Sequence, residues 1–121
     1  MKKKVFIIAE IGINHEGNIN SCLKLIKKAK YAGADAVKLQ TINPNNNYVS
    51  KSKSFKIFNK GMLSVNETKK AFNYAKKNNI KIFTTCGDID TAKWVEKLNP
   101  IAWKISSGLI HHIPLISYLS K

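Results

Sequence analysis

Polar and charged side chains stand toward the carboxyl ends of four apolar segments in this chain. The segments are residues 5–17, 34–41, 80–85 and 101–108, and the side chains are Glu10, Lys38, Gln40, Thr84, Thr85, Lys104, Ser106 and Ser107. A carboxylate can transfer a proton, and ammonium and hydroxyl groups can hold an anion. Because an ionic group inside an apolar run is costly to bury without a partner, we expect these groups at the rim of a ligand pocket.

The segments that carry these groups have the pattern of strands. Along residues 37–40, apolar Val37 and Leu39 alternate with polar Lys38 and Gln40. Successive side chains of a strand point to opposite faces, so we predict that the apolar pair meets helices and the polar pair faces the mouth of a barrel. Parallel strands would bring such polar groups together at their carboxyl ends.

Amphipathic helix patterns separate the predicted strands. They cover residues 20–32, about 65–77, about 89–98 and a last stretch near 113–119. Asn18 or Asn20 can cap the first helix, and Asp88 can cap the third. Ser64 and Glu67 have the spacing of a capping box for the second. This alternation predicts parallel βαβ units in one α/β domain or part of one.

One stretch interrupts the alternation of strands and helices. Residues 42–61 are rich in Asn, Ser and Lys, and they are too many for a simple connection between two elements. We therefore expect a loop over the pocket mouth or a disordered flap at this place.

Composition narrows the functional class. The formal net charge is +14, but all 21 basic residues are lysines, whereas arginine is favoured for bidentate recognition of bases and phosphates. The lysines are spread over helix faces without interleaved aromatic residues, so we expect no dedicated nucleic-acid surface. No stretch is long and apolar enough to span a membrane, and residues 1–8 lack a secretory signal. We expect a soluble cytoplasmic protein in which Cys22 and Cys86 are reduced thiols.

Three blocks of sequence resemble a known family. They are AEIGINHEG at residues 9–17, AGADAVKLQT at 32–41 and WKISSG at 103–108. Together, and in this order, they closely resemble the amino-terminal part of bacterial sialic acid synthases, the N-acetylneuraminate synthase family. The resemblance covers nearly the whole chain. It implies a (β/α)₈ TIM barrel of which residues 1–121 form the amino-terminal half, with about the first four βα units, and without the antifreeze-like domain that follows the barrel in the family.

The resemblance also implies an activity. Members of this family are transferases that condense phosphoenolpyruvate with an N-acylmannosamine-type sugar, which releases phosphate and gives a nine-carbon 2-keto sugar acid for surface polysaccharides. Such an enzyme uses a divalent metal, manganese or magnesium, and we expect the ligands of that metal to lie outside this chain. The expected partners are phosphoenolpyruvate and an N-acylated amino sugar.

Family roles carry over to individual positions. Glu10 corresponds to the active-site glutamate of the family. Five further residues correspond to substrate-binding positions: Lys38, Gln40, Thr85, Lys104 and Ser107. The residues of the turn Asn14-His15-Glu16-Gly17 are too close in sequence to form a complete metal site. We predict that Asn14 and His15 shape this turn and support the residues that touch substrate.

Two positions depart from the family pattern. Leu109 stands where the sialic acid synthases commonly have an acidic residue, and Thr85 is followed by Cys86 and Gly87 in place of a Thr-Pro-Phe-type run. The acceptor sugar is therefore left open between N-acetylmannosamine and a related deoxy sugar.

Each candidate residue also has a simpler interpretation. The lysines can be surface residues of a lysine-rich chain, the threonines can be strand formers, and Ser107 can be a turn residue. His111 and His112 would then be loop residues. Asp88 and Asp90 would favour the start of a helix and would not bind a metal.

Two other functions stay open as alternatives. Four βα units leave strand edges and apolar surface uncovered, so we expect the 121-residue chain to be a fragment or truncated product without turnover of its own. The second hypothesis is therefore a non-catalytic half-barrel that binds anionic ligands or a partner chain, for example as a homodimer. The third is a basic nucleic-acid module, whose binding would fall steeply with salt.

Overall fold

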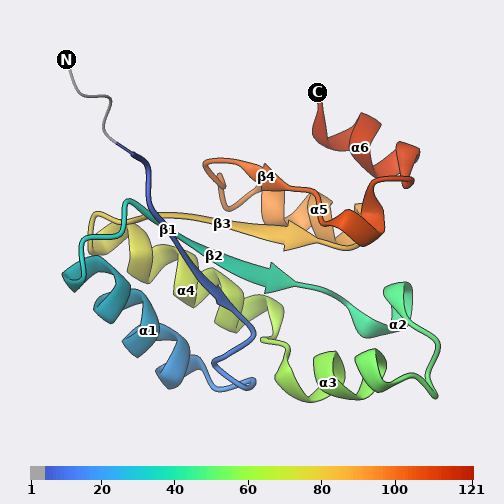
Figure 1. Cartoon of the computed structure of the whole chain (residues 1–121), viewed down its shortest axis with the longest axis horizontal. Coiled ribbons are helices and arrows are strands. Elements are labelled where there is room, and N and C mark those ends of the chain that lie inside the picture. Colours follow the sequence, from blue (N-terminus) through green and yellow to red (C-terminus); the bar gives the residue numbers. More distant parts are fainter. Residues whose placement is uncertain (1–4) are drawn as a thin grey trace.

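Parallel strands form the centre of the structure, a computed structural model that describes residues 5–121 (Figure 1). Within that range the strands are β1 (Ile8–Gly12), β2 (Ala36–Thr41), β3 (Lys81–Cys86) and β4 (Trp103–Lys104). They lie in the order β1-β2-β3-β4, and each pair of neighbours is parallel. The predicted parallel βαβ organisation is confirmed, although β4 is shorter than the segment predicted at residues 101–108.

Helices connect the strands and pack against one face of the sheet. Those at the predicted positions are α1 (Ile19–Tyr31), α4 (Val65–Lys77), α5 (Ile89–Glu96) and α6 (Ile113–Leu119). Their apolar sides and the helix-facing side chains of the strands form one core, in which Ile26, Val37, Phe72, Val95 and Leu115 are fully buried. This packing decides which face of each strand is covered by helices. The opposite face carries Glu10, Lys38 and Thr85, together with the apolar Phe83, which is in register with Lys38.

Capping contacts define where the helices begin. The side chain of Asn18 caps α1, and that of Asp88 caps α5. Ser64 and Glu67 form the predicted capping box at the start of α4. These contacts join residues at most three positions apart, which explains why the sequence indicated them correctly. The end of α5 lies at Glu96, slightly before the predicted end at residue 98.

The prediction for residues 42–61 was wrong about the form of this stretch, because two short helices make up much of it, although its first residues do line a cavity as a loop over a pocket mouth would. It contains α2 (Pro44–Asn47) and α3 (Lys53–Gly61). The side chains of Asn43 and Ser52 cap these two helices. The ring of Tyr48 stacks on that of Phe58, with the centroids 5.3 Å apart. The Asn and Ser residues that indicated a loop therefore act as helix caps, which is the other common role of these residue types.

The structure also bears on two features that composition raised, the two cysteines and the length and hydropathy of the helices. Cys22 and Cys86 are free, as predicted, and both are buried. Burial raises the pKa of each thiol to about 12. Within residues 5–121, no helix combines the length and the hydropathy that crossing a membrane requires.

Candidate functional site

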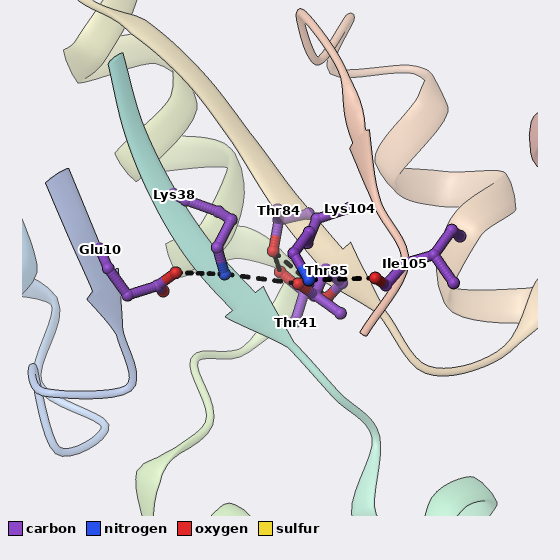
Figure 2. Close-up of polar contacts among 7 residues, drawn as sticks. All are labelled: Glu10, Lys38, Thr41, Thr84, Thr85, Lys104 and Ile105. Carbon is purple, nitrogen blue, oxygen red and sulfur yellow. Dashed lines mark hydrogen bonds and ion pairs between the residues drawn. The ribbon is translucent and has the colours of Figure 1, made fainter. Parts of the chain in front are cut away.

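Charged and hydroxyl side chains form a row across the sheet on the face opposite the helices (Figure 2). Glu10 on β1 lies opposite Lys38 on β2, and the Nζ atom of Lys38 lies 2.6 Å from Oε2 of Glu10. The same ammonium donates a long hydrogen bond of 3.5 Å to Oγ1 of Thr85 on β3. Three neighbouring strands thus bring together three of the residues that the sequence indicated.

Burial makes the ion pair between Glu10 and Lys38 asymmetric. The side chain of Lys38 is only 9% exposed, whereas that of Glu10 is 54% exposed. A shielded ammonium needs a counter-charge close by, and the Glu10 carboxylate supplies it in this structure. Because Glu10 also faces solvent, its carboxylate is accessible to a molecule arriving at the open face of the sheet.

Gln40 approaches Glu10 above Gly12, at the end of β1. A Cβ atom added at Gly12 would lie 3.4 Å from Oε1 of Glu10 and 3.5 Å from Oε1 of Gln40. The φ angle of Gly12 is +56°, a left-handed conformation that suits glycine. Gln40 also lines a cavity of about 320 Å³ at the carboxyl ends of the strands. Gln40 is therefore both a neighbour of Glu10 and part of the lining of this cavity.

Lys104 lies next to the row, on β4. It pairs in register with Thr85, and Figure 2 shows its side chain beside that residue. The Lys104 side chain is exposed, and its Nζ atom donates to the carbonyl oxygen of Ile105 at 3.0 Å. Lys38 and Lys104 thus place two ammonium groups on the same face of the sheet, on either side of Thr85.

Ser107 and Leu109 lie beyond the strands. They begin and end η1 (Ser107–Leu109), a short 3₁₀ helix that follows β4. Ser107 is exposed, and no hydrogen bond joins its side chain to the row of Glu10, Lys38 and Thr85. Leu109 packs against the apolar core. The structure thus does not bring Ser107 into contact with the other candidate residues.

His15 shapes the turn between β1 and α1. Its side chain is 2% exposed, and its Nδ1 atom accepts a hydrogen bond from the backbone N–H of Gly17 at 3.2 Å. Asn14, by contrast, is exposed. His15 also lines the cavity beside Gln40. The position of His15 agrees with the predicted role in the turn.

Stability should depend on pH through His15. Burial lowers the pKa of this imidazole below its usual value, and a hydrogen bond to the Gly12 backbone and the charge of Glu67 oppose that shift. The unfolded chain then binds more protons at this site than the folded chain, so the free energy of unfolding falls as the pH falls below about 6.5. We expect a lower urea midpoint at about pH 5.5 than at about pH 7.5 in the native chain.

The matched control for this pH effect is His15→Gln, which cannot titrate. Its urea midpoint should change less over the same interval, because the remaining groups with a lowered pKa, such as Glu67, protonate at lower pH. An equal loss of stability in both chains would exclude His15 as the cause.

The described residues do not fit a metal centre. Within residues 5–121, no three His, Cys, Asp or Glu side chains gather where they could hold a metal ion. Asp88, one of the pair that resembled metal ligands, instead accepts hydrogen bonds from the backbone N–H and hydroxyl of Thr91, both at 2.9 Å. We therefore derive no chemical step through a metal from these residues.

Some polar contacts were not foreseen from the sequence. Thr84 faces the helix side of the sheet, where its hydroxyl lies 2.8 Å from that of Thr41. The amide of Asn47 donates to Oδ2 of Asp88 at 3.2 Å. The partners in these contacts are more than 40 positions apart along the chain, so no local sequence pattern indicated them.

Comparison with known proteins agrees with this geometry. A model of the NeuB family matches residues 25–121. The chain is 32% identical to a pseudaminic acid synthase of Campylobacter jejuni, over 87% of this chain and 35% of that protein. It is also 32% identical to an N,N'-diacetyllegionaminic acid synthase of the same species, over 98% of this chain and 40% of that protein.

A solved structure resembles the fold closely. The crystal structure of a sialic acid synthetase from Leptospira borgpetersenii, in complex with citrate, matches with a TM-score of 0.90 and 28% identity, over 96% of this chain and 41% of that one. The parallel sheet and its helices thus correspond to the amino-terminal part of a TIM-barrel-type synthase. The chain spans 35% and 40% of the length of the two Campylobacter relatives. Because the family model covers most of the sequence, the chain belongs to the NeuB family.

Proposed function

We propose that residues 1–121 form the amino-terminal half of the catalytic barrel of a sialic-acid-type synthase. In this proposal the enzyme condenses phosphoenolpyruvate with an N-acylated amino sugar of the mannosamine type. The observation that carries the proposal is the row on the open face of the sheet, where the shielded ammonium of Lys38 lies between Glu10 and Thr85.

The row has the chemistry that phosphoenolpyruvate requires. This substrate carries a carboxylate and a phosphate, and ammonium, hydroxyl and amide groups can hold both. In the proposal Lys38 and Lys104 bind the two anionic groups, and Thr85 and Gln40 add hydrogen bonds from the strands. Ser107, exposed on η1 beyond the end of β4, is proposed to contact the substrate from outside the row. Donors that are fixed on neighbouring strands need little reorganisation as charge develops, which lowers the barrier.

Glu10 has a separate role in the proposed reaction. The methylene carbon of phosphoenolpyruvate forms a bond to the carbonyl carbon of the sugar, and the carbonyl oxygen takes up a proton. Water then adds at the second carbon of phosphoenolpyruvate and loses one proton. The hydroxyl group so formed loses its own proton as the C–O bond to phosphate breaks, which leaves the 2-keto acid and inorganic phosphate. The accessible carboxylate of Glu10 is placed to orient the sugar carbonyl or to handle one of these protons.

The names of the relatives support the reaction class. Pseudaminic acid synthase, diacetyllegionaminic acid synthase and sialic acid synthetase are each named for making an acidic sugar. Because their products differ, the proposal extends to the class of acceptor and not to one sugar. In the proposal a divalent metal, manganese or magnesium, also takes part, and its ligands lie outside this chain.

Binding is the test that reaches the residues of this chain, because the chain spans well under half of the length of its relatives. We expect calorimetric titration of the 121-residue chain to give tighter binding of phosphoenolpyruvate than of pyruvate or inorganic phosphate, since only phosphoenolpyruvate carries both anionic groups. Equal affinity for phosphoenolpyruvate and sulfate, or no binding, would overturn the proposed site.

A second assay separates catalysis from binding. The chain is mixed with phosphoenolpyruvate, N-acetylmannosamine and manganese, and the release of phosphate and the formation of the 2-keto acid are followed. Product that depends on both substrates would support the synthase directly. The amino-terminal half of a synthase, which covers 35% and 40% of the length of the two Campylobacter relatives, should bind phosphoenolpyruvate without forming product. Clear turnover by the 121-residue chain would refute the expectation that it has none of its own.

A further inference from the structure

The segment of residues 42–61, which we call the strap, packs very closely on the turn after β3. A Cβ atom added at Gly87 would lie 2.1 Å from Oδ1 and 2.5 Å from Cγ of Asn47. Gly87 is not among the glycines with a left-handed φ. A larger residue at position 87 would thus collide with the side chain of Asn47, whereas the backbone conformation there does not require glycine.

A buried acceptor holds Asn47 in this place. Its Nδ2 atom donates to Oδ2 of Asp88 at 3.2 Å and to the carbonyl oxygen of Asn43 at 2.8 Å. Asp88 is 9% exposed, and its carboxylate is already fixed by the backbone N–H and the hydroxyl of Thr91. A hydrogen bond to a carboxylate that is immobile and shielded from water is stronger than one between neutral, solvated groups.

The carboxyl end of the strap packs closely on the turn after β1. A Cβ atom at Gly17, which has a φ of +73°, would lie 2.7 Å from the carbonyl oxygen of Lys60. Stacking of Tyr48 on Phe58 links the two halves of the strap. The strap is thus hydrogen-bonded to the residues after β3 and packs closely on the turn after β1, on either side of the end of β2.

The strap lies against the cavity of about 320 Å³ at the carboxyl ends of the strands. Ile42, Asn43 and Asn45 of the strap line this cavity, together with Gln40 and His15. Movement of the strap would therefore change the size and opening of the cavity directly.

We propose that Asn47 is a positioning residue that fastens the strap across the ends of the strands through Asp88 and the space left by Gly87. Fastening keeps the cavity beside Gln40 in its observed shape. The effect on substrate rests on the proposed function, because it acts through Gln40. The fastening itself is independent of that function and can be measured without a ligand.

Hydrogen exchange of the 121-residue chain tests the fastening. In Asn47→Ala the amides of residues 48–61 should exchange about tenfold faster than in the native chain, while those of α1 and α4 keep their rates. Gly87→Ala should have the same effect, because the added methyl group displaces Asn47. The matched control is Asn46→Ala, which removes an exposed neighbour whose side chain makes no hydrogen bond to Asp88.

A pair of charge variants keeps the proposal testable if Asn47→Ala does not fold. Asn47→Asp sets two carboxylates against each other, and adding Asp88→Asn restores a donor and an acceptor at this contact. Exchange of residues 48–61 should be faster in the single variant than in the double variant. Equal rates in these two chains, or equal rates in Asn47→Ala and Asn46→Ala, would overturn the proposal.

A ligand titration distinguishes failure of the fastening from failure of the proposed function. If the native chain binds phosphoenolpyruvate, Asn47→Ala should weaken that binding, and Asn46→Ala should not. Faster exchange in Asn47→Ala together with no binding by the native chain would support the fastening and count against the proposed function alone.

Discussion

Replacing Lys38 with methionine is expected to weaken binding of phosphoenolpyruvate by roughly 100-fold, the scale seen when one partner of a shielded charge pair is removed. The Lys38 ammonium is shielded from solvent, unlike that of the exposed Lys104, and it contacts both Glu10 and Thr85. Methionine keeps a long flexible apolar side chain, and the exposed carboxylate of Glu10 can be hydrated, so the fold should survive. Calorimetric titration of the folded variant measures the effect.

Lys27→Met is the matched control for the Lys38 variant. Lys27 is exposed on α1, so its replacement removes the same charge from the surface and leaves the row intact. Its affinity for phosphoenolpyruvate should stay within about twofold of the native value at physiological salt, because exposed charges are screened. Equal losses in both variants would mean that the general positive field of the chain, and not a site at Lys38, attracts the ligand.

Phe72→Ala is expected to give the largest loss of stability, about 3–5 kcal/mol in the free energy of unfolding. Phe72 lies on α4, is completely buried and belongs to the core that joins the helices to the sheet. The substitution removes a large apolar side chain and leaves a cavity that close-packed neighbours fill only in part. Urea unfolding followed by circular dichroism measures the loss.

Tyr31→Ala provides the comparison on the surface. Tyr31 ends α1 and is 96% exposed, so its removal should change the free energy of unfolding by no more than about 0.5 kcal/mol. If both variants lost the same amount of stability, the core would not be organised around Phe72 as the structure indicates.

The pairing of Glu10 with Lys38 illustrates how far the candidate site could be predicted. Alternation along residues 37–40 placed Lys38 on the face opposite Val37 and Leu39, and the structure confirms this placement. The direct contact with Glu10, however, depends on the register between β1 and β2. A shift of one residue would have moved every side chain of a strand to the other face, and nothing in either segment alone determines that register.

Ser107, by contrast, lies apart from the other candidate residues in the structure. The resemblance to the sialic acid synthases placed it among the substrate-binding residues, next to Lys104 in sequence. In the structure β4 ends at Lys104, and Ser107 begins a 3₁₀ helix outside the row. Proximity along the chain did not translate into contact, because the backbone leaves the strand direction between these two residues.

The sequence by itself determined the starts of the helices at Ser64 and Asp88 and limited that of the first helix to Asn18 or Asn20, because a cap joins residues only two or three positions apart. It also determined the alternation that separates the two faces of β2. Only the tertiary structure decided the form of residues 42–61 and their attachment through Asn47 to Asp88. Asn and Ser serve loops and helix caps equally well, and the contact that selects between these roles comes from a turn 41 positions away along the chain.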